Sequence, residues 1–347
     1  MAYGSGLAAQ LGVKAETVVG TEVVVDTFYE FTSASPTFKP TWITGQGLRA
    51  GQAYERAARV SQGVLTVDGE ISLEYTDRGH MGLLWRHALG SAITVPTQIA
   101  ASTAYKQVHT PGPKAGLGLT VQLGRPQTDG TVRPFTYRGV KVPEWEFTVS
   151  AGSERGAELT LNIDAWQENT ATALAVASYA PAAQLFTFVD AATFKLGGTA
   201  TTTAGETTIS GGLALGTVFS ELTIKGETGM KVDRYGLGGG GVKKEQLENA
   251  VPTITGQLKG EFTNRVEIYD VFRAGTPMPL QLDFSHGDAG GGNPYLLSFI
   301  LPAVKITETT IDVDGGDLLG QEVAFKAFDD GTNPVLQVKL VSTDTTL

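Results

Sequence analysis

Thr66-Val-Asp-Gly-Glu-Ile-Ser-Leu-Glu-Tyr-Thr-Asp-Arg78 and Thr253-Ile-Thr-Gly-Gln-Leu-Lys-Gly-Glu-Phe-Thr-Asn-Arg265 are two versions of one sequence, 187 positions apart. Both copies keep a central glycine and end in Glu, an aromatic residue, Thr, Asp or Asn, and Arg. The likeness continues downstream, where Met81, Leu84 and Trp85 match Ile268, Val271 and Phe272. A repeat of this length indicates two copies of one folding unit. One chain can then occupy two equivalent places in a symmetric assembly.

Each copy has the pattern of a strand followed by a helix. Apolar and polar residues alternate over 64–75 and 252–262, the period of a half-buried strand. The spacing then becomes helical, which predicts one short helix near 78–90 and another near 265–274. Gly90 and Gly275 stand where a left-handed cap would end each helix. We expect the core side of the helices to be formed by Leu84, Trp85, Val271 and Phe272.

Each unit closes with a further pair of alternating strands, so both halves are predicted to be mainly β with one short helix. The first unit spans 1–170 and the second 185–347, with a linker over 171–184. A polar, glycine-bearing segment precedes each repeated strand, at 45–62 and 236–250. Matching Gly47-Leu48 to Gly236-Leu237 needs an offset of 189 rather than 187. We expect both segments to be exposed loops.

Composition excludes several classes of function. The chain of 347 residues has no cysteine, and hence no disulfide, thiolate metal site or cysteine nucleophile. No signal peptide or membrane span is expected. The net charge of −10 is uneven, with −2 up to residue 180 and −8 beyond it. This balance argues against tight nucleic-acid binding, which needs clustered Lys and Arg.

Two sequence features could suggest a metal site. His80 and His87 could share a helical face, but no further ligand stands at a telling spacing for zinc, so we expect partly exposed helix histidines. Asp312-Val-Asp-Gly-Gly-Asp317 begins like a calcium loop but has Val323 at its twelfth position, where an EF-hand has Glu. A β-turn is the better interpretation of this segment.

Two other features could suggest a phosphate loop or an active site. Gly236 to Lys244 has Val242 where a phosphate-binding loop requires lysine, which favours a flexible loop. Glu144 and Glu146 could form a carboxylate pair, although Glu on the solvent side of a strand is commonplace. The sequence therefore predicts neither an enzyme nor a bound cofactor.

Several segments together resemble one family. They are Gly4-Ser-Gly-Leu-Ala-Ala-Gln-Leu-Gly-Val-Lys-Ala-Glu-Thr17, Leu119-Thr-Val-Gln-Leu-Gly-Arg-Pro126, Gly130-Thr-Val-Arg-Pro-Phe-Thr-Tyr-Arg-Gly-Val-Lys141 and Leu185-Phe-Thr-Phe-Val-Asp-Ala-Ala-Thr193 with Gly197-Gly198. With the duplicated β-unit, they resemble the major tail tube proteins of long-tailed bacteriophages. The likeness is to the larger, duplicated class found in phages of actinobacteria.

The resemblance implies two tandem tail-tube-like β-sandwich or barrel domains in a structural virion protein. Such subunits form rings that stack into a hollow tube, through which DNA passes during injection without specific binding. Single-unit members form rings of six, so a duplicated chain is expected to form trimeric rings with pseudo-sixfold symmetry. The implied partners are further copies, the tape-measure protein, and the tail terminator and distal tail proteins. The implied location is the phage tail, after synthesis in the host cytoplasm.

The resemblance also indicates candidate residues for two surfaces. An acidic channel would repel phosphates, and the candidates for its lining are Asp68, Glu70, Glu74 and Glu261. The tube exterior is an equally good location for these four side chains. By position, the glycine-bearing loops correspond to the loop that contacts the next ring, with candidates Arg49, Tyr54, Arg56, Gly238, Gly239, Gly240, Lys243 and Lys244.

Two other functions fit the sequence less well. A distal tail or baseplate ring protein would have a related fold but a lower copy number. A carbohydrate-binding β-sandwich would present a row of exposed aromatic residues, whereas Trp42, Trp85, Trp145 and Trp166 are scattered.

Overall fold

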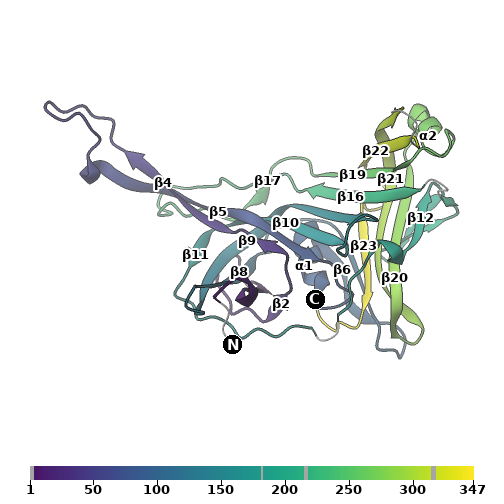
Figure 1. Cartoon of the computed structure of the whole chain (residues 1–347), viewed down its shortest axis with the longest axis horizontal. Helices are drawn as coiled ribbons and strands as arrows, with labels where there is room; N and C mark the ends of the chain where they lie inside the picture. Colours follow the sequence, from purple (N-terminus) through teal and green to yellow (C-terminus); the bar gives the residue numbers. More distant parts are fainter. Residues whose placement is uncertain (1–3, 181–182, 215–217, 314–317) are drawn as a thin grey trace.

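The computed structural model describes residues 4–180, 183–214, 218–313 and 318–347. It is mainly β, with antiparallel strand pairs and two short α-helices, as the sequence predicts (Figure 1). The repeated segments form β5 (Val60–Glu74) and β19 (Thr253–Glu261). Both predicted strands are confirmed, and β5 extends further toward the N-terminus than its pattern indicated.

The centre of the fold is a sheet with eight strand positions, in which one order of four occurs twice. The first unit runs β3–β4, β5, β10, β9, and the second runs β16, β19, β22, β21. β3 and β4 together fill one position, because both pair with β5 and only Ser35 and Pro36 separate them. The bounds of the strands not yet given are β3 (Ser33–Ala34), β4 (Thr37–Thr44), β9 (Val132–Ser150), β10 (Glu158–Ala165), β16 (Phe219–Glu227), β21 (Asn293–Asp312) and β22 (Gly320–Ala327).

The strand register shows that the two units are true counterparts. Gly69 of β5 lies opposite Ile163 of β10, and Gly256 of β19 lies opposite Phe325 of β22. Each long strand, β9 and β21, also has a bulge where it passes its partner. Bulges bend a strand and increase its twist. This bend therefore recurs at the same place in both copies.

The long strands continue into further layers that cover the sheet. The first part of β9 pairs with β8 and β11, and β1 and β2 follow beyond β8. The first part of β21 pairs with β20 and β23, which lead to β12 on one side and to β7 and β6 on the other. The bounds are β1 (Gln10–Ala15), β2 (Thr27–Tyr29), β6 (Gly90–Gln98), β7 (Tyr105–Pro111), β8 (Leu119–Pro126), β11 (Gln167–Asn169), β12 (Ala191–Leu196), β20 (Met278–Gly290) and β23 (Gln337–Ser342).

Smaller strand pairs complete the fold. One hairpin is formed by β13 (Thr199–Thr203) and β14 (Glu206–Ser210), and β15 (Leu213–Ala214) pairs with β12. β17 (Met230–Lys231) pairs with β18 (Leu247–Glu248) at the base of the second glycine-bearing loop.

The two predicted helices are present but differ in burial. α1 (Met81–Leu89) ends at Gly90, whose φ is +104°, and α2 (Tyr269–Ala274) ends at Gly275, whose φ is +65°. Both glycines thus form the left-handed caps that the sequence predicts. Leu84 and Trp85 of α1 are buried in the core, whereas Val271 and Phe272 of α2 are only partly buried against it.

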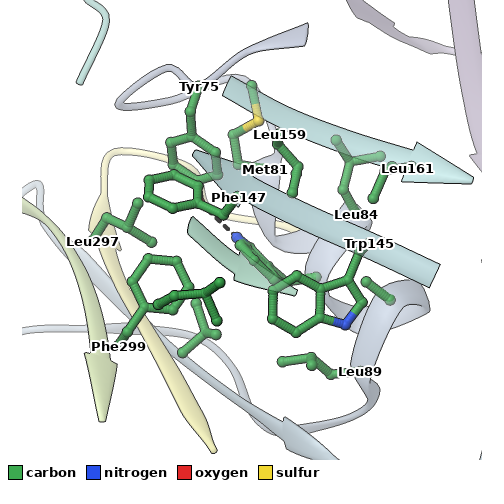
Figure 2. Close-up of a cluster of buried hydrophobic side chains, with 14 of the residues drawn as sticks. Tyr75, Met81, Leu84, Leu89, Trp145, Phe147, Leu159, Leu161, Leu297 and Phe299 are labelled. Carbon is green, nitrogen blue, oxygen red and sulfur yellow. Dashed lines mark hydrogen bonds between the residues drawn. The ribbon is translucent and has the colours of Figure 1, made fainter. Parts of the chain in front are cut away.

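Aromatic side chains from both halves meet in one hydrophobic core. The Trp85 ring lies 5.1 Å from that of Trp145 on β9 and 5.6 Å from that of Phe299 on β21. Figure 2 shows Trp145 and Phe299 in this core. The Trp85 indole N–H donates to the Tyr75 hydroxyl at 2.9 Å, so no polar atom of the indole is left unpaired. Since β9 also pairs with β16, and β7 with β23, the halves share both sheet and core. The segment 171–184 therefore does not separate two independent cores.

Candidate assembly surface

One face of the eight-position sheet is polar. On β5, Val67, Ile71 and Leu73 point into the core, and the alternate residues Asp68, Glu70 and Glu74 lie on the opposite face. On β19, Glu261 is exposed at the end of the strand. Because cross-strand neighbours share a face, the register extends this polar face over the other strands. It includes Glu144, Glu146, Glu158, Glu221, Glu227, Glu308, Glu322, Lys39, Lys225, Lys259, Lys305 and Lys326.

Three of the lysines on the polar face lie among carboxylates. Lys259 lies 3.6 Å from Glu221 and 3.8 Å from Glu322, and Lys225 lies 3.5 Å from both Glu144 and Glu227. Lys39 pairs with Asp68. Carboxylates outnumber lysines here, so the face has a net negative charge. Of the four predicted channel residues, Asp68 is thus paired, and the other three have no ion pair within the described residues.

The sheet ends in two edges that have no strand partner among the described residues. One is the outer side of β3–β4, which pairs only with β5. The other is the last part of β21, residues 305–312, which pairs with β22 on one side only. Unpaired edges expose backbone donors and acceptors, and proteins usually cover or pair them. Trp42 and Ile43 on β4 are also exposed.

The two glycine-bearing loops are the same length and turn in the same way. Thr44 pairs with Val60, and Lys231 pairs with Leu247, so both loops have 15 residues and the offset is 187. Gly51 and Gly238 both have positive φ, and matching turn hydrogen bonds run from Gln52 N to Arg49 O and from Gly239 N to Gly236 O. The offset of 189 inferred from the Gly-Leu match is therefore wrong. The sequence identity there was local, whereas backbone register fixes the true correspondence.

The second loop, residues 232–246, packs on the first half. The Lys243 ammonium lies 2.5 Å from the Asp164 carboxylate on β10, and the Gln246 side chain donates to that same carboxylate at 2.6 Å. Glu245 lies 2.7 Å from Lys141 on β9. These contacts bury Lys243, Gln246, Asp164 and Lys141. The expectation that the whole loop is exposed is wrong for Lys243, because its charge is neutralised by Asp164 on the strand beneath.

Burial and hydrogen bonds together shift the pKa values of the charged groups in and beside this cluster. Burial raises the pKa of the Asp164 carboxyl, and the contacts with Lys243 and Gln246 partly offset that rise. Burial likewise lowers the pKa of Lys114 to about 8, against the opposing attraction of Glu248. For Glu245, hydrogen bonds from Lys141 and Gly116 outweigh burial and leave the pKa lowered. The cluster is therefore a buried polar network, which is costly to break.

The other predicted loop residues remain accessible. Arg49 and Tyr54 are exposed at the far end of the β4–β5 arm, which extends away from the body at the upper left of Figure 1, and Arg56 is half-buried. Gly238, Gly240 and Lys244 are exposed and Gly239 is half-buried. Sequence reasoning missed Asp164, Lys141 and Gln246, because their partners are distant in sequence. The one available signal was a charged residue between two apolar residues, at Lys141 and at Asp164.

The remaining sequence motifs have structural surroundings. His87 is buried rather than partly exposed, because α1 packs into the core, and His80 lies at the start of α1. Within the described ranges no three His, Asp or Glu residues are grouped to hold a metal ion. The segment Asp312–Asp317, predicted to be a β-turn, lies largely outside the described residues. Glu144 and Glu146 lie on the polar face, where Glu144 contacts Asn162 and Lys225.

No helix in the part of the chain that the structure describes is long and apolar enough to cross a membrane. No curated protein matches the chain. The model of one family, described as phage tail tube protein, matches residues 6–327 and thus nearly the whole chain. Its members are structural components of the virion tail. A duplicated sheet with two unpaired edges is in keeping with a subunit that assembles with copies of itself, and the chain belongs to the phage tail tube protein family.

Proposed function

We propose that three copies of this chain close their sheets into a ring, and that the rings stack into the tail tube through which DNA passes. The observation that carries the proposal is the junction between β9 and β16. There, residues 144–150 of the first unit pair with residues 221–227 of the second, joining two like units edge to edge. Repeating this junction between chains would use the two free edges.

The free edges are the counterparts of the strands that form the junction. Lys225 of β16 lies opposite Thr255 of β19, and Thr37 of β4 lies opposite Asp68 of β5, at matching points of the repeat. Likewise, Thr309 of β21 pairs with Val323 as Trp145 of β9 pairs with Leu161. The last part of β21 could therefore receive β3–β4 of a neighbour, as β9 receives β16. Closure into a barrel would leave no edge exposed.

The same closure would direct the polar face toward one side of the ring. The other face packs on α1 and the covering strands, so the polar face is open to solvent except where the second loop covers Asp164 and Lys141. We assign it to the channel, with Asp68, Glu70, Glu74 and Glu261 as lining residues. Its negative charge would repel DNA phosphates and let the genome slide without binding. The exposed loop tips near Gly51 and Gly238 would contact the next ring, and the tape-measure protein would fill the channel before injection.

Electron microscopy of the purified protein tests the proposal. We expect hollow tubes whose end-on class averages show three-fold symmetry with six similar lobes. Thr309→Pro, which removes an N–H donor at the counterpart of Trp145, should abolish rings while the circular dichroism spectrum is unchanged. Rings that persist in Thr309→Pro, or rings of another symmetry, would contradict closure through this edge.

The channel assignment has its own test. Tubes with Glu70→Lys and Glu146→Lys should bind double-stranded DNA at low salt, whereas parent tubes should not. A matched change of exposed residues away from this face, Asp329→Lys and Asp288→Lys, serves as the control. Equal DNA binding by the two variants would place the polar face outside the channel.

A further inference from the structure

The contact between the second loop and the first half provides a template for a contact between chains. The Tyr235 hydroxyl donates to the Leu65 carbonyl at 2.9 Å, and the Leu65 N–H donates to the Gly241 carbonyl at 2.9 Å. Trp166, next to this contact, donates from its indole N–H to Gln246. The loop is thus held by hydrogen bonds at the end of β5 and β10.

Each residue of this contact has a counterpart in the other copy. On the loop side, the 187 offset places Leu48 at the position of Tyr235 and Tyr54 at that of Gly241. On the sheet side, Val251 and Pro252 correspond to Val64 and Leu65. Phe328 corresponds to Trp166, because each follows the last residue of its strand and donates its backbone N–H to the long strand, at Ala303 O and Arg138 O respectively.

At the counterpart positions, both the loop and the sheet surface have apolar groups in place of hydrogen-bonding groups. Pro252 has no N–H to donate, and Leu48 has no hydroxyl, so neither hydrogen bond could form there. Apolar groups take their place on both surfaces. In the single chain these groups are unburied, with exposed fractions of 103% for Leu48, 90% for Tyr54, 85% for Val251 and 40% for Phe328. Exposed apolar groups on two matching surfaces indicate that each covers the other.

We propose that loop 45–59 docks on the second half of the neighbouring chain in the same ring, with Leu48 and Tyr54 packed against Val251, Pro252 and Phe328. This inference rests on the proposed ring. It adds a second surface, besides the sheet edge, through which neighbouring chains of the ring are joined. The partner is a second copy, because within one chain the arm and β22 lie at opposite ends of the molecule (Figure 1). The residues on either side of the turn at 49–52 then serve contacts within the ring, and the turn itself is left for the next ring.

The two sheet surfaces differ in charge. The position of Asp164 on β10 is taken on β22 by Lys326, which lies opposite Lys305 as Asp164 lies opposite Lys141. Lys243 of the second loop would therefore be repelled from the second-half surface, since the pair that holds it to Asp164 would become two cations. In the first loop, Arg56 takes the position of Lys243, so docking must direct Arg56 away from Lys326; Glu55, the one carboxylate of this loop, precedes it in the chain. The apolar groups, rather than an ion pair, therefore hold the first loop to the second half.

Engineered cysteines test the docking directly, because the chain has none of its own. We would assemble tubes from Leu48→Cys/Val251→Cys protein and treat them with a short bismaleimide. Dissolution in detergent and electrophoresis would then count the linked chains. Tyr235→Cys/Val64→Cys is the matched control, which should link within one chain and run as a compact monomer. Each single-cysteine variant controls for random linkage.

The docking predicts bands of two and three linked chains and none above, because contacts within a ring close on themselves. A ladder continuing beyond the ring number would place the loop on the next ring and overturn the inference while leaving the tube intact. Unlinked chains in assembled tubes, with the control linked, would also overturn it. A ladder ending at another number would retain the docking and refute three-fold rings. A parent protein that forms no rings in micrographs would refute both.

Discussion

Lys243 and Arg56 occupy the same position in two matching loops, yet only Lys243 is buried. Its ammonium lies 2.5 Å from Asp164 and its exposed fraction is 3%, whereas Arg56 is half-buried and has no ion pair within the described residues. Within one chain, therefore, the second loop packs on a sheet surface and the first loop does not. Arg56 is therefore a matched control for measuring how much the contact of Lys243 with Asp164 contributes to the free energy of unfolding.

Lys243→Met should lower the free energy of unfolding by about 3–5 kcal/mol, because it leaves Asp164 buried without its cation. Arg56→Met should change it by less than about 0.5 kcal/mol in the monomer. Urea unfolding of the unassembled chain at pH 7 measures both. Equal effects of the two substitutions would show that the buried Lys243–Asp164 pair adds nothing beyond an arginine that has no ion pair.

Acid should destabilise the fold through two buried histidines. Burial, together with the Arg86 charge and, for His87, the Lys141 charge, lowers the pKa of both His87 and His109 to about 3. The unfolded chain takes up these protons near pH 6.5, so their contribution to stability is complete above that pH and falls as the pH drops toward 3. At pH 4.5 the loss should be about 2–3 kcal/mol per histidine.

Thermal unfolding between pH 7 and 4.5 checks this expectation against the variant His87→Gln/His109→Gln. The variant should lose less stability than the parent over that range, whatever its stability at pH 7. Parallel curves for the two proteins would exclude the histidines as the source of acid sensitivity.

The two helices should differ in their response to truncation. Trp85→Ala removes a fully buried indole packed on Trp145 and Phe299, and should cost about 3–5 kcal/mol. Phe272→Ala, at the matching position of the partly buried α2, should cost about 1–2 kcal/mol. Denaturant midpoints of the two variants provide the comparison, and a Phe272→Ala cost as large as that of Trp85→Ala would contradict the observed burial.

The helix caps offer a similar pair. A Cβ at Gly90 would lie 2.1 Å from the Gly112 carbonyl oxygen, whereas at Gly275 the nearest atom would be 3.6 Å away, on Lys305. Both positions have positive φ, so Gly275→Ala should cost about 1–2 kcal/mol from backbone strain alone. Gly90→Ala should cost about 3 kcal/mol or more, since overpacking adds to the strain. Differential scanning calorimetry of both variants would reveal whether the close contact matters.

Local patterns predicted the elements of the fold, but not how they meet. The alternation around Gly69 and Gly256 identified two strands, and the helical spacing with Gly90 and Gly275 identified two helices and their ends, because those signals lie within a few residues. Pairing between β9 and β16, and burial of Lys243 on Asp164, join residues that are far apart in the chain. Nothing in either local sequence specifies such a partner. The loop alignment failed for the same reason, since a two-residue identity outweighed a register that only the paired strands determine.

The junction between β9 and β16 has a kinetic consequence. Because both strands belong to one polypeptide, this pairing is intramolecular and does not depend on protein concentration. A ring of three such chains has half as many junctions between molecules as a ring of six single units. Fusion of the two units therefore shifts part of the translational and rotational entropy cost of assembly from subunit association to the folding of one chain.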